Sequence, residues 1–289
     1  MPVADINGVH IAYEVIGDHG RPWIITPGGR FSKDYGGVRE FAEAIAAHGN
    51  RVVIWDRPNC GESDVCFEGE SESDMQADAL VGLLRHLDMA PAVIIGGSGG
   101  ARVSLLAAAR HPDACQALAC WWISGGYLGL MALANYYCFP SLGAAWKYDM
   151  EAVADLPDWQ EVISRNPRNR DIILRQDRRT FMDTLERWSA VYYPRADQKV
   201  PGLSDDLAAR LTMPTLVFRS GESDLHHTRA TSEALAAGLP NARLVDPPWG
   251  DREWIERGEQ REVDGSSIFC RWHLLTPQLI DWSNEVLGS

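Results

Sequence analysis

The chain has 289 residues, of which 45% are hydrophobic, so it can bury the core of one large domain or of a domain with a sizeable insertion. This composition excludes a disordered protein, and the sequence contains no low-complexity tract or internal repeat. The formal charge of −13 excludes the nucleic-acid-binding classes, because no basic stripe is available to neutralise phosphates.

The predicted elements of the first 124 residues alternate between strands and helices. An Asn7-Gly8 turn indicates an opening hairpin over 3–16. Apolar runs predict strands at 23–26, 51–55 and 92–95, and helical periodicity predicts helices over 38–48, from a capping box at Ser73 and Gln76, and over 99–110. This alternation predicts an α/β protein with a mostly parallel sheet flanked by helices on both faces.

The pattern changes after the apolar run at 117–123. Residues 125–207 carry helical stretches rich in Trp, Tyr, Met and Leu but no clear strand. Alternation resumes with a strand at 214–218, a helix near 227–238, a strand at 242–245 and a last helix from Thr276 and Pro277. We therefore predict a core of residues 1–124 and 208–289, interrupted by a helical lid (cap) insertion of residues 125–207.

The sequence lacks the motifs that direct a protein to export, to a membrane or to a metal. The first residues do not have the charged and then apolar layout of a signal peptide, and no apolar segment is long enough for a bilayer. The six cysteines are scattered, without a Cys-x-x-Cys pair or a histidine at metal-ligand spacing, which predicts reduced thiols and no metal. We expect a cytoplasmic protein without nucleic-acid or membrane partners, and the oligomeric state is left open, a homodimer included.

The stretch Gly96-Gly97-Ser98-Gly99-Gly100 stands between a predicted strand and a predicted helix. A phosphate-binding P-loop needs Gly-Lys-Ser/Thr at the helix start, and a dinucleotide-binding turn needs glycine where Arg102 stands, so neither fits. Gly-x-Ser-x-Gly in this context predicts a strained turn that exposes the Ser98 hydroxyl and points the Gly99 amide at a developing oxyanion. We therefore predict that Ser98 is a nucleophile and expect no cofactor.

A serine hydroxyl is too weak an acid to attack unaided, so it needs a histidine base that is oriented by a carboxylate. His273 is the predicted base, because it follows the last predicted strand and precedes the last helix, at the carboxyl edge of the sheet. His226 and His227, which follow the strand at 214–218, remain alternatives. The other histidines are expected on solvated surfaces or at the wrong end of a helix.

The orienting carboxylate is expected on a loop that follows a late strand. Asp224 follows the strand at 214–218 directly and is the predicted residue, with Glu222 as an alternative closer to the strand end. Asp246 and Asp251 lie at the exit of the next strand, where we expect solvated charges.

Taken together, these motifs resemble the α/β-hydrolase superfamily, in its form with a serine nucleophile elbow and a helical lid. The match lies in the elbow at 96–100, the segment Asp56-Arg57-Pro58-Asn59-Cys60-Gly61-Glu62-Ser63, the Gly-x-x-Asp ending at Asp224, and His273 before the final helix. The resemblance covers about the whole chain and implies a triad of Ser98, Asp224 and His273. It leaves the substrate open, because this superfamily includes esterases, lactonases, peptidases and C–C hydrolases.

The chain departs from the family pattern in the loop after the strand at 23–26. The usual His-Gly is replaced by Pro27-Gly28-Gly29. Because proline has no N–H to donate, Gly29 is the expected second oxyanion donor, with Gly28 and Arg30 as neighbouring alternatives. Arg30 is either a solvated surface residue or a partner for a substrate carboxylate.

A second departure lies between Asp224 and His273, where the chain is longer than usual. It carries a charged stretch at 249–257, which is expected to be either an exposed insertion or part of the site rim. Trp272 replaces the glycine that commonly precedes the histidine, and we expect its ring to wall the pocket.

The residues at 125–207 are dense in aromatic and aliphatic side chains, most of which are expected to pack in their own core. A lid over an active site also exposes apolar surface to the cavity. The predicted substrate-binding residues are Arg30, Trp122, Tyr127, Tyr137, Trp188 and Trp272. The expected substrate is therefore a small hydrophobic molecule.

The leading hypothesis is a serine hydrolase that cleaves a small hydrophobic carboxylic ester or lactone through a Ser98 acyl-enzyme, with His273 as general base. One alternative is a C–C bond hydrolase of a ring-fission-type keto acid, in which Arg30 or a lid arginine holds the carboxylate. Another is a peptidase similar to proline iminopeptidases, which share Gly-Gly-Ser-x-Gly and the cysteine at position 60. A hydrolase-like receptor without useful turnover is the hypothesis from a different class.

Overall fold

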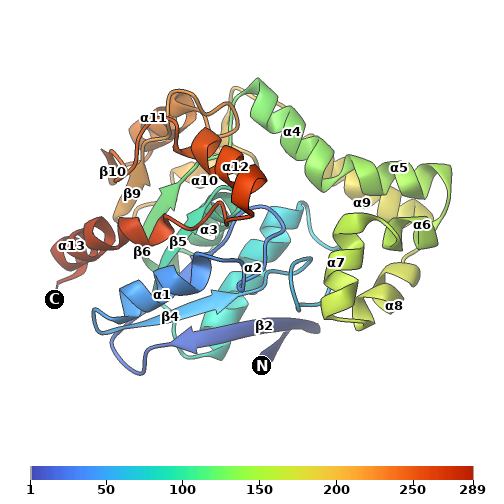
Figure 1. Cartoon of the computed structure of the whole chain (residues 1–289), viewed down its shortest axis with the longest axis horizontal. Helices are drawn as coiled ribbons and strands as arrows, with labels where there is room; N and C mark the ends of the chain where they lie inside the picture. Colours follow the sequence, from blue (N-terminus) through green and yellow to red (C-terminus); the bar gives the residue numbers. More distant parts are fainter. Residues whose placement is uncertain (1, 289) are drawn as a thin grey trace.

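The computed structural model describes residues 2–288, and its centre is one large twisted sheet covered by helices on both faces (Figure 1). Eight strands form this sheet in the order β1-β2-β4-β3-β5-β6-β9-β10. Their bounds are β1 Val3–Ile6, β2 Val9–Ile16, β3 Arg21–Thr26, β4 Asn50–Trp55, β5 Ala92–Gly97, β6 Cys115–Trp121, β9 Thr215–Phe218 and β10 Ala242–Val245. β2 pairs in antiparallel fashion with both β1 and β4. Every other pairing, from β4 to β10, is parallel, which confirms the predicted, mostly parallel sheet.

The two faces of the sheet bury separate hydrophobic clusters. Helices α2 (Glu72–His86), α3 (Gly99–Arg110) and α11 (Arg229–Gly238) cover one face, and α1 (Val38–Ala46) and α13 (Thr276–Leu287) cover the other. In β5, Ile94 packs in the first cluster while Val93 and Ile95 pack in the second, because successive strand residues point to opposite faces. Burial on both faces explains why the central strands are continuous apolar runs in the sequence.

Three local features differ from the sequence predictions. The N-cap of α2 is Ser71, whose hydroxyl accepts from the Asp74 amide at 3.0 Å, and not Ser73. The charged stretch after β10 forms a helix, α12 (Glu253–Asp264). A two-stranded sheet of β7 (Gln198–Val200) and β8 (Leu203–Ser204) lies in the region for which no strand is predicted. Short polar segments of this kind carry a weak periodicity signal.

Between β6 and β9 the chain forms a group of helices that gathers to one side of the sheet (Figure 1). Their bounds are α4 Tyr127–Tyr137, α5 Phe139–Lys147, α6 Met150–Ala154, α7 Pro157–Arg165, α8 Arg168–Leu174 and α9 Arg178–Ala190, followed after β8 by α10 Asp205–Ala208. Helices α4 to α9 share a hydrophobic cluster that Val65 and Phe67 of the core join, whereas Ala208 of α10 packs in the cluster on one face of the sheet. That residues 125–207 act as a lid domain stays a prediction at this point.

The structure also describes the lengths of the helices and the state of the cysteines. Within residues 2–288, no helix combines the length and the apolar character needed to cross a membrane. All six cysteines are free thiols, and five of them are buried. Burial raises the pKa of Cys60 and of Cys66 to about 11, so both thiols stay protonated near neutral pH.

Candidate active site

Ser98 occupies the turn between β5 and α3. Its φ of 57° and ψ of −123° lie in a region that non-glycine residues rarely adopt, so the turn is strained. The turn is possible because its neighbours have no side chain: a Cβ on Gly96 would lie 2.5 Å from the Gly100 carbonyl oxygen, and one on Gly100 would collide with Thr26. The Ser98 hydroxyl is thereby presented at the carboxyl end of the sheet, as the pattern predicts.

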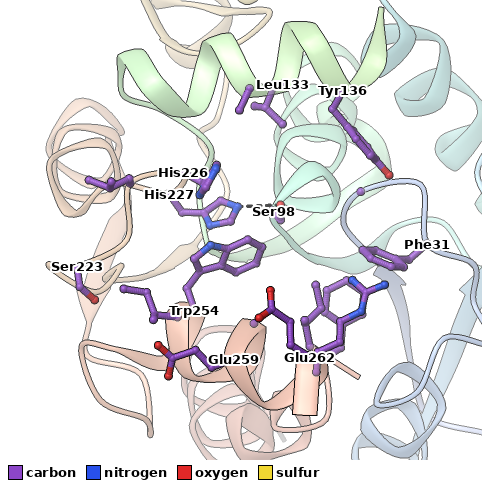
Figure 2. A pocket seen from close by; sticks show the side chains of 18 of the residues that line it. Phe31, Ser98, Leu133, Tyr136, Ser223, His226, His227, Trp254, Glu259 and Glu262 are labelled. Carbon is purple, nitrogen blue, oxygen red and sulfur yellow. Dashed lines mark hydrogen bonds between the residues drawn. The ribbon is translucent and has the colours of Figure 1, made fainter. Parts of the chain in front are cut away.

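A hydrogen-bonded chain of side chains leads away from Ser98 (Figure 2). The Ser98 Oγ lies 2.8 Å from Nε2 of His227, the contact that Figure 2 draws as a dashed line. Nδ1 of His227 lies 2.9 Å from Oδ2 of Asp224. The other Asp224 oxygen accepts the backbone amides of His226 and His227, each at 2.9 Å. A buried carboxylate can only accept, so Nδ1 carries the proton and Nε2 is free to accept from the serine.

Both partners of Ser98 therefore come from one loop, between β9 and α11. The loop is short because Thr228, the residue after His227, is already the N-cap of α11, with its hydroxyl accepting from Thr231. The imidazole of His227 is held by two indoles: Trp122 stacks on it with centroids 6.1 Å apart, and Trp254 meets it edge-on at 4.5 Å. The alternative that the sequence left open at His227 thus supplies the histidine beside Ser98.

The structure does not bring His273 to Ser98. His273 lies on a 3₁₀ turn (Trp272–Leu275) before α13, with its side chain exposed in a separate hollow beside Gly36, Gly37 and Glu40 of the α1 region. The physical reason is the path of the chain after β10, which forms α12 and returns toward α1. The prediction that His273 pairs with Ser98 is corrected accordingly.

The two glycines predicted to hold an oxyanion lie together. A Cβ on Gly99 would lie 3.2 Å from the backbone nitrogen of Gly29. Gly29 has a φ of 52°, in the left-handed region that favours glycine, and Arg57 fixes this loop by donating to the carbonyl oxygens of Gly28 at 3.2 Å and Gly29 at 2.6 Å. A Cβ on Gly28 would instead lie 2.7 Å from the Cβ of Ser98, so Gly28 packs against the nucleophile.

Ser98 lines a pocket of about 1010 Å³ that lies between α4 and α12 (Figure 2). α4 contributes the apolar wall, with Leu133, Tyr136 and Tyr137, and α12 contributes the opposite wall. The α12 residues that line it are Trp254, Ile255, Gly258, Glu259, Arg261 and Glu262. The remaining lining combines the apolar Phe31, Leu225, Ile268 and Phe269 with Gly29 and the polar Ser98, Ser223, His226 and His227.

Of the six predicted substrate-binding residues, Tyr137 alone lines this pocket. Trp122 and Trp272 are buried behind it in an aromatic cluster, where their rings lie 5.7 Å apart. Trp188 is buried in the core of the inserted helices and donates to the Gly69 carbonyl oxygen at 3.2 Å. Tyr127 is 75% exposed and lines a different hollow.

Arg30 is not available to a substrate carboxylate. Its guanidinium is 7% exposed and forms an ion pair with the buried Glu72 at 2.7 Å. It also donates to the Tyr137 carbonyl oxygen at 3.2 Å and lies over the Trp159 ring at 4.6 Å. Arg30 therefore ties the Gly29 loop to α2 and to the inserted helices, which corrects both expectations for this residue.

That α12 forms a pocket wall was not predicted, although the sequence carries a signal for it. Trp254, Gly258 and Glu262 recur at a spacing of four, and Ile255 and Glu259 form a parallel row, so these residues share one face of a helix. The sequence left open whether the stretch at 249–257 is an exposed insertion or part of the site rim, and its residues Trp254 and Ile255 line the pocket. At the mouth, burial and the neighbouring His227 hold the pKa of His226 below its usual value, so His226 is neutral near pH 7.

A group of carboxylates close enough for a metal ion lies elsewhere in the structure. It consists of Asp34, Asp56 and Glu62. The buried ammonium of Lys33 lies among them, 2.8 Å from Asp34, 3.6 Å from Asp56 and 3.2 Å from Glu62. This lysine supplies a positive charge among the three carboxylates, and the burial of Lys33 and Asp56 makes their ion pair part of the fold of the Asp56 segment.

Comparison with known proteins agrees with the fold. Residues 22–142 match a family model described as alpha/beta hydrolase fold. The chain is 26% identical to a proline iminopeptidase of Neisseria gonorrhoeae over 80% of this chain and 68% of that protein. It is 27% identical to a 2-hydroxy-6-oxononadienedioate/2-hydroxy-6-oxononatrienedioate hydrolase of Pseudomonas putida over 70% of each.

Among solved structures, the enol-lactonase from Burkholderia xenovorans LB400 aligns with a TM-score of 0.58 and 22% identity, over 97% of this chain and 99% of that chain. This likeness concerns the fold. The match of residues 22–142, the order of the strands and the Ser98 turn at the end of β5 lead to one conclusion: the chain has the α/β-hydrolase fold.

Proposed function

We propose that this protein is a serine hydrolase of small hydrophobic carboxylic esters or lactones. The observation that carries the proposal is the hydrogen-bonded series Ser98, His227 and Asp224 at the floor of a largely apolar pocket. In this proposal His227 takes the role that the sequence gave to His273. Apolar walls with few polar groups suit an uncharged acyl or alcohol moiety.

The reaction follows from the donors and acceptors present. Nε2 of His227 accepts the proton of Ser98 as Oγ attacks the carbonyl carbon, and the carbonyl electron pair moves to oxygen beside the amides of Gly29 and Gly99. The same nitrogen then gives this proton to the leaving alcohol as the C–O bond breaks, which leaves an acyl group on Ser98. Water, deprotonated by His227, attacks that acyl group and releases the acid.

The alternatives differ in the charge that they require in the pocket. A ring-fission keto acid is anionic, and its carboxylate was assigned to Arg30 or a lid arginine. Arg30 is paired with Glu72, and the pocket lining includes Arg261 of α12 beside Glu259 and Glu262. A peptidase acting at an N-terminus needs acidic groups for the substrate amine. Glu259 and Glu262 line the pocket on α12, so aminopeptidase activity is the second candidate function.

Labelling with a fluorophosphonate probe, followed by a substrate panel, tests the proposal. We expect the wild type to be labelled at Ser98 and the Ser98→Ala variant to remain unlabelled. In the panel, nitrophenyl esters or lactones are expected to exceed a prolyl anilide and a ring-fission keto acid in kcat/KM. Absence of wild-type labelling, or equal labelling of Ser98→Ala, contradicts the serine mechanism; a preference for either other substrate identifies the bond class instead.

Gly258 offers a test of the pocket wall. A Cβ at this position on α12 would meet no atom within 4 Å, so a leucine there extends into the pocket. We expect Gly258→Leu to lower kcat/KM for long-chain esters by at least about tenfold while short-chain esters are little affected. The measurement is a series of nitrophenyl ester chain lengths.

The matched control is Gly143→Leu, at a helical glycine of α5 that also meets no atom within 4 Å and does not line the pocket. It is expected to leave the chain-length profile unchanged. If Gly258→Leu lowered kcat/KM equally for short and long chains, α12 would not be the wall that limits acyl length.

A further inference from the structure

Tyr137 ends helix α4 and reaches the Ser98 turn from the side of the inserted helices. Its side chain is 4% exposed and lines the pocket. The Tyr137 hydroxyl lies 2.8 Å from the point where a Cβ on Gly99 would stand, and the backbone nitrogen of Gly29 lies 3.2 Å from the same point. The hydroxyl therefore sits beside the two glycines whose amides are the proposed oxyanion donors.

The Tyr137 ring is fixed before any substrate arrives. Its carbonyl oxygen accepts from Arg30 at 3.2 Å, the Tyr136 ring meets it edge-on at 4.8 Å, and the Tyr192 ring stacks on it at 6.0 Å with an interplanar angle of 5°. Fixed donors cost no reorganisation when charge develops, which is the condition for effective electrostatic catalysis.

The hydroxyl proton of Tyr137 has no acceptor among residues 2–288, and the hydroxyls of its two aromatic neighbours already accept from other donors. The Tyr136 hydroxyl accepts from the Arg30 amide at 3.2 Å, and the Tyr192 hydroxyl accepts from Arg102 at 3.3 Å. A phenol hydroxyl at a nearly buried position normally has a partner. Because the Tyr137 hydroxyl faces the pocket, an oxygen of the substrate is the acceptor that is available to it.

Two arginine side chains near the Tyr137 hydroxyl favour a negative charge on an atom beside it. The guanidinium of Arg102 lies 5.3 Å from the Tyr137 ring centroid, and that of Arg57 lies 3.7 Å from the Cβ point on Gly99. Both are buried, and within the described residues no carboxylate forms a salt bridge with either; Glu72 pairs with Arg30 instead. Two buried cations without an anionic partner stabilise an anion that forms nearby.

We propose that the Tyr137 hydroxyl is a catalytic residue, donating a third hydrogen bond to the oxyanion of the tetrahedral intermediate beside the amides of Gly29 and Gly99. This inference rests on the proposed serine mechanism. It also accounts for Gly99: any side chain at this position would displace the hydroxyl from the donor site. The substrates it suits are carbonyl compounds whose oxygen becomes negatively charged during attack by Ser98.

The first test is Tyr137→Phe, which keeps the ring and removes the hydroxyl. We expect kcat to fall about 100-fold, the lower end of the loss for one oxyanion donor, with little change in KM. Affinity for a trifluoromethyl ketone, which forms a charged tetrahedral adduct with the serine, is expected to fall by a similar factor, while affinity for an uncharged ether analogue of the substrate, which forms no oxyanion, is unchanged. Tyr127→Phe removes the hydroxyl of an exposed tyrosine on the same helix, outside the pocket, and is expected to keep the wild-type kcat and ketone affinity.

Gly99→Ala provides a second variant that does not depend on Tyr137→Phe being well folded. We expect a loss in kcat similar to that of Tyr137→Phe and a double variant no slower than Tyr137→Phe, because the added methyl acts by displacing the hydroxyl. Unchanged kcat and ketone affinity in a folded Tyr137→Phe protein whose Ser98 is labelled by fluorophosphonate overturn the inference alone. A wild type that neither labels at Ser98 nor turns over esters overturns the proposed function itself.

Discussion

Replacement of His227 by alanine is expected to lower kcat about 10⁶-fold. The remaining rate would come from substrate binding and from the oxyanion donors alone. Its Nε2 lies 2.8 Å from the serine oxygen, and no other imidazole among residues 2–288 forms a hydrogen bond with Ser98. Without it, the serine proton has no acceptor at the moment of attack. The measurement is kcat and KM on the best nitrophenyl ester, with folding checked by circular dichroism.

His273→Ala is the matched control, because it removes the histidine that the sequence pattern favoured. The exposed His273 side chain lies beside α1, so we expect kcat within error of the wild type. His226→Ala removes the other neighbouring ring at the pocket mouth and is expected to act on KM more than on kcat. Loss of activity in His273→Ala with activity retained in His227→Ala would reverse the assignment of the base.

Replacement of Asp224 by asparagine is expected to lower kcat about 10⁴-fold with little change in KM. The carboxylate accepts from Nδ1 of His227 and so keeps Nε2 free of a proton. An asparagine amide that donates to Nδ1 would place the imidazole proton on Nε2, where it blocks transfer from Ser98. The side chain is nearly isosteric, so the loss is expected in activity and not in the thermal unfolding midpoint.

Two carboxylates that the sequence placed near the same sheet edge serve as controls for Asp224. Glu222 is 79% exposed on its side chain, and Asp251 pairs with Arg229 on the surface. Glu222→Gln and Asp251→Asn are each expected to keep kcat close to the wild type, because neither residue contacts His227. A kcat for Asp224→Asn close to that of these variants would show that the carboxylate does not set the imidazole tautomer.

The location of His227 and Asp224 on one loop leaves the chain after β10 to shape the pocket. With Asp224 and His227 both between β9 and α11, the chain after β10 holds no member of the hydrogen-bonded series. That segment forms α12, and its Trp254 packs edge-on against His227 while Gly258, Glu259 and Glu262 line the cavity. The segment thus shapes the pocket and supports the imidazole from outside.

The sequence alone determined the features that depend on short-range constraints. Apolar runs separated by helical periodicity indicated the strands and helices, because burial on two faces requires such runs. The turn at Ser98 was predictable since only glycines at 96 and 100 leave room for it, and Gly29 was predictable since proline at 27 cannot donate. Asp224 could be placed because it directly follows a strand of the sheet.

The tertiary structure decided which of the histidines reaches Ser98. His227 and His273 both satisfy the rule of lying near the carboxyl edge, and only the path of the chain through α12 separates them. The same holds for the pocket lining. Trp188 and Tyr137 are both aromatic residues of the region 125–207, and the sequence does not distinguish them. In the structure Trp188 is buried among the inserted helices, whereas Tyr137 lines the pocket at Ser98. Contacts between residues far apart in the chain depend on the packing of whole elements, which local periodicity does not encode.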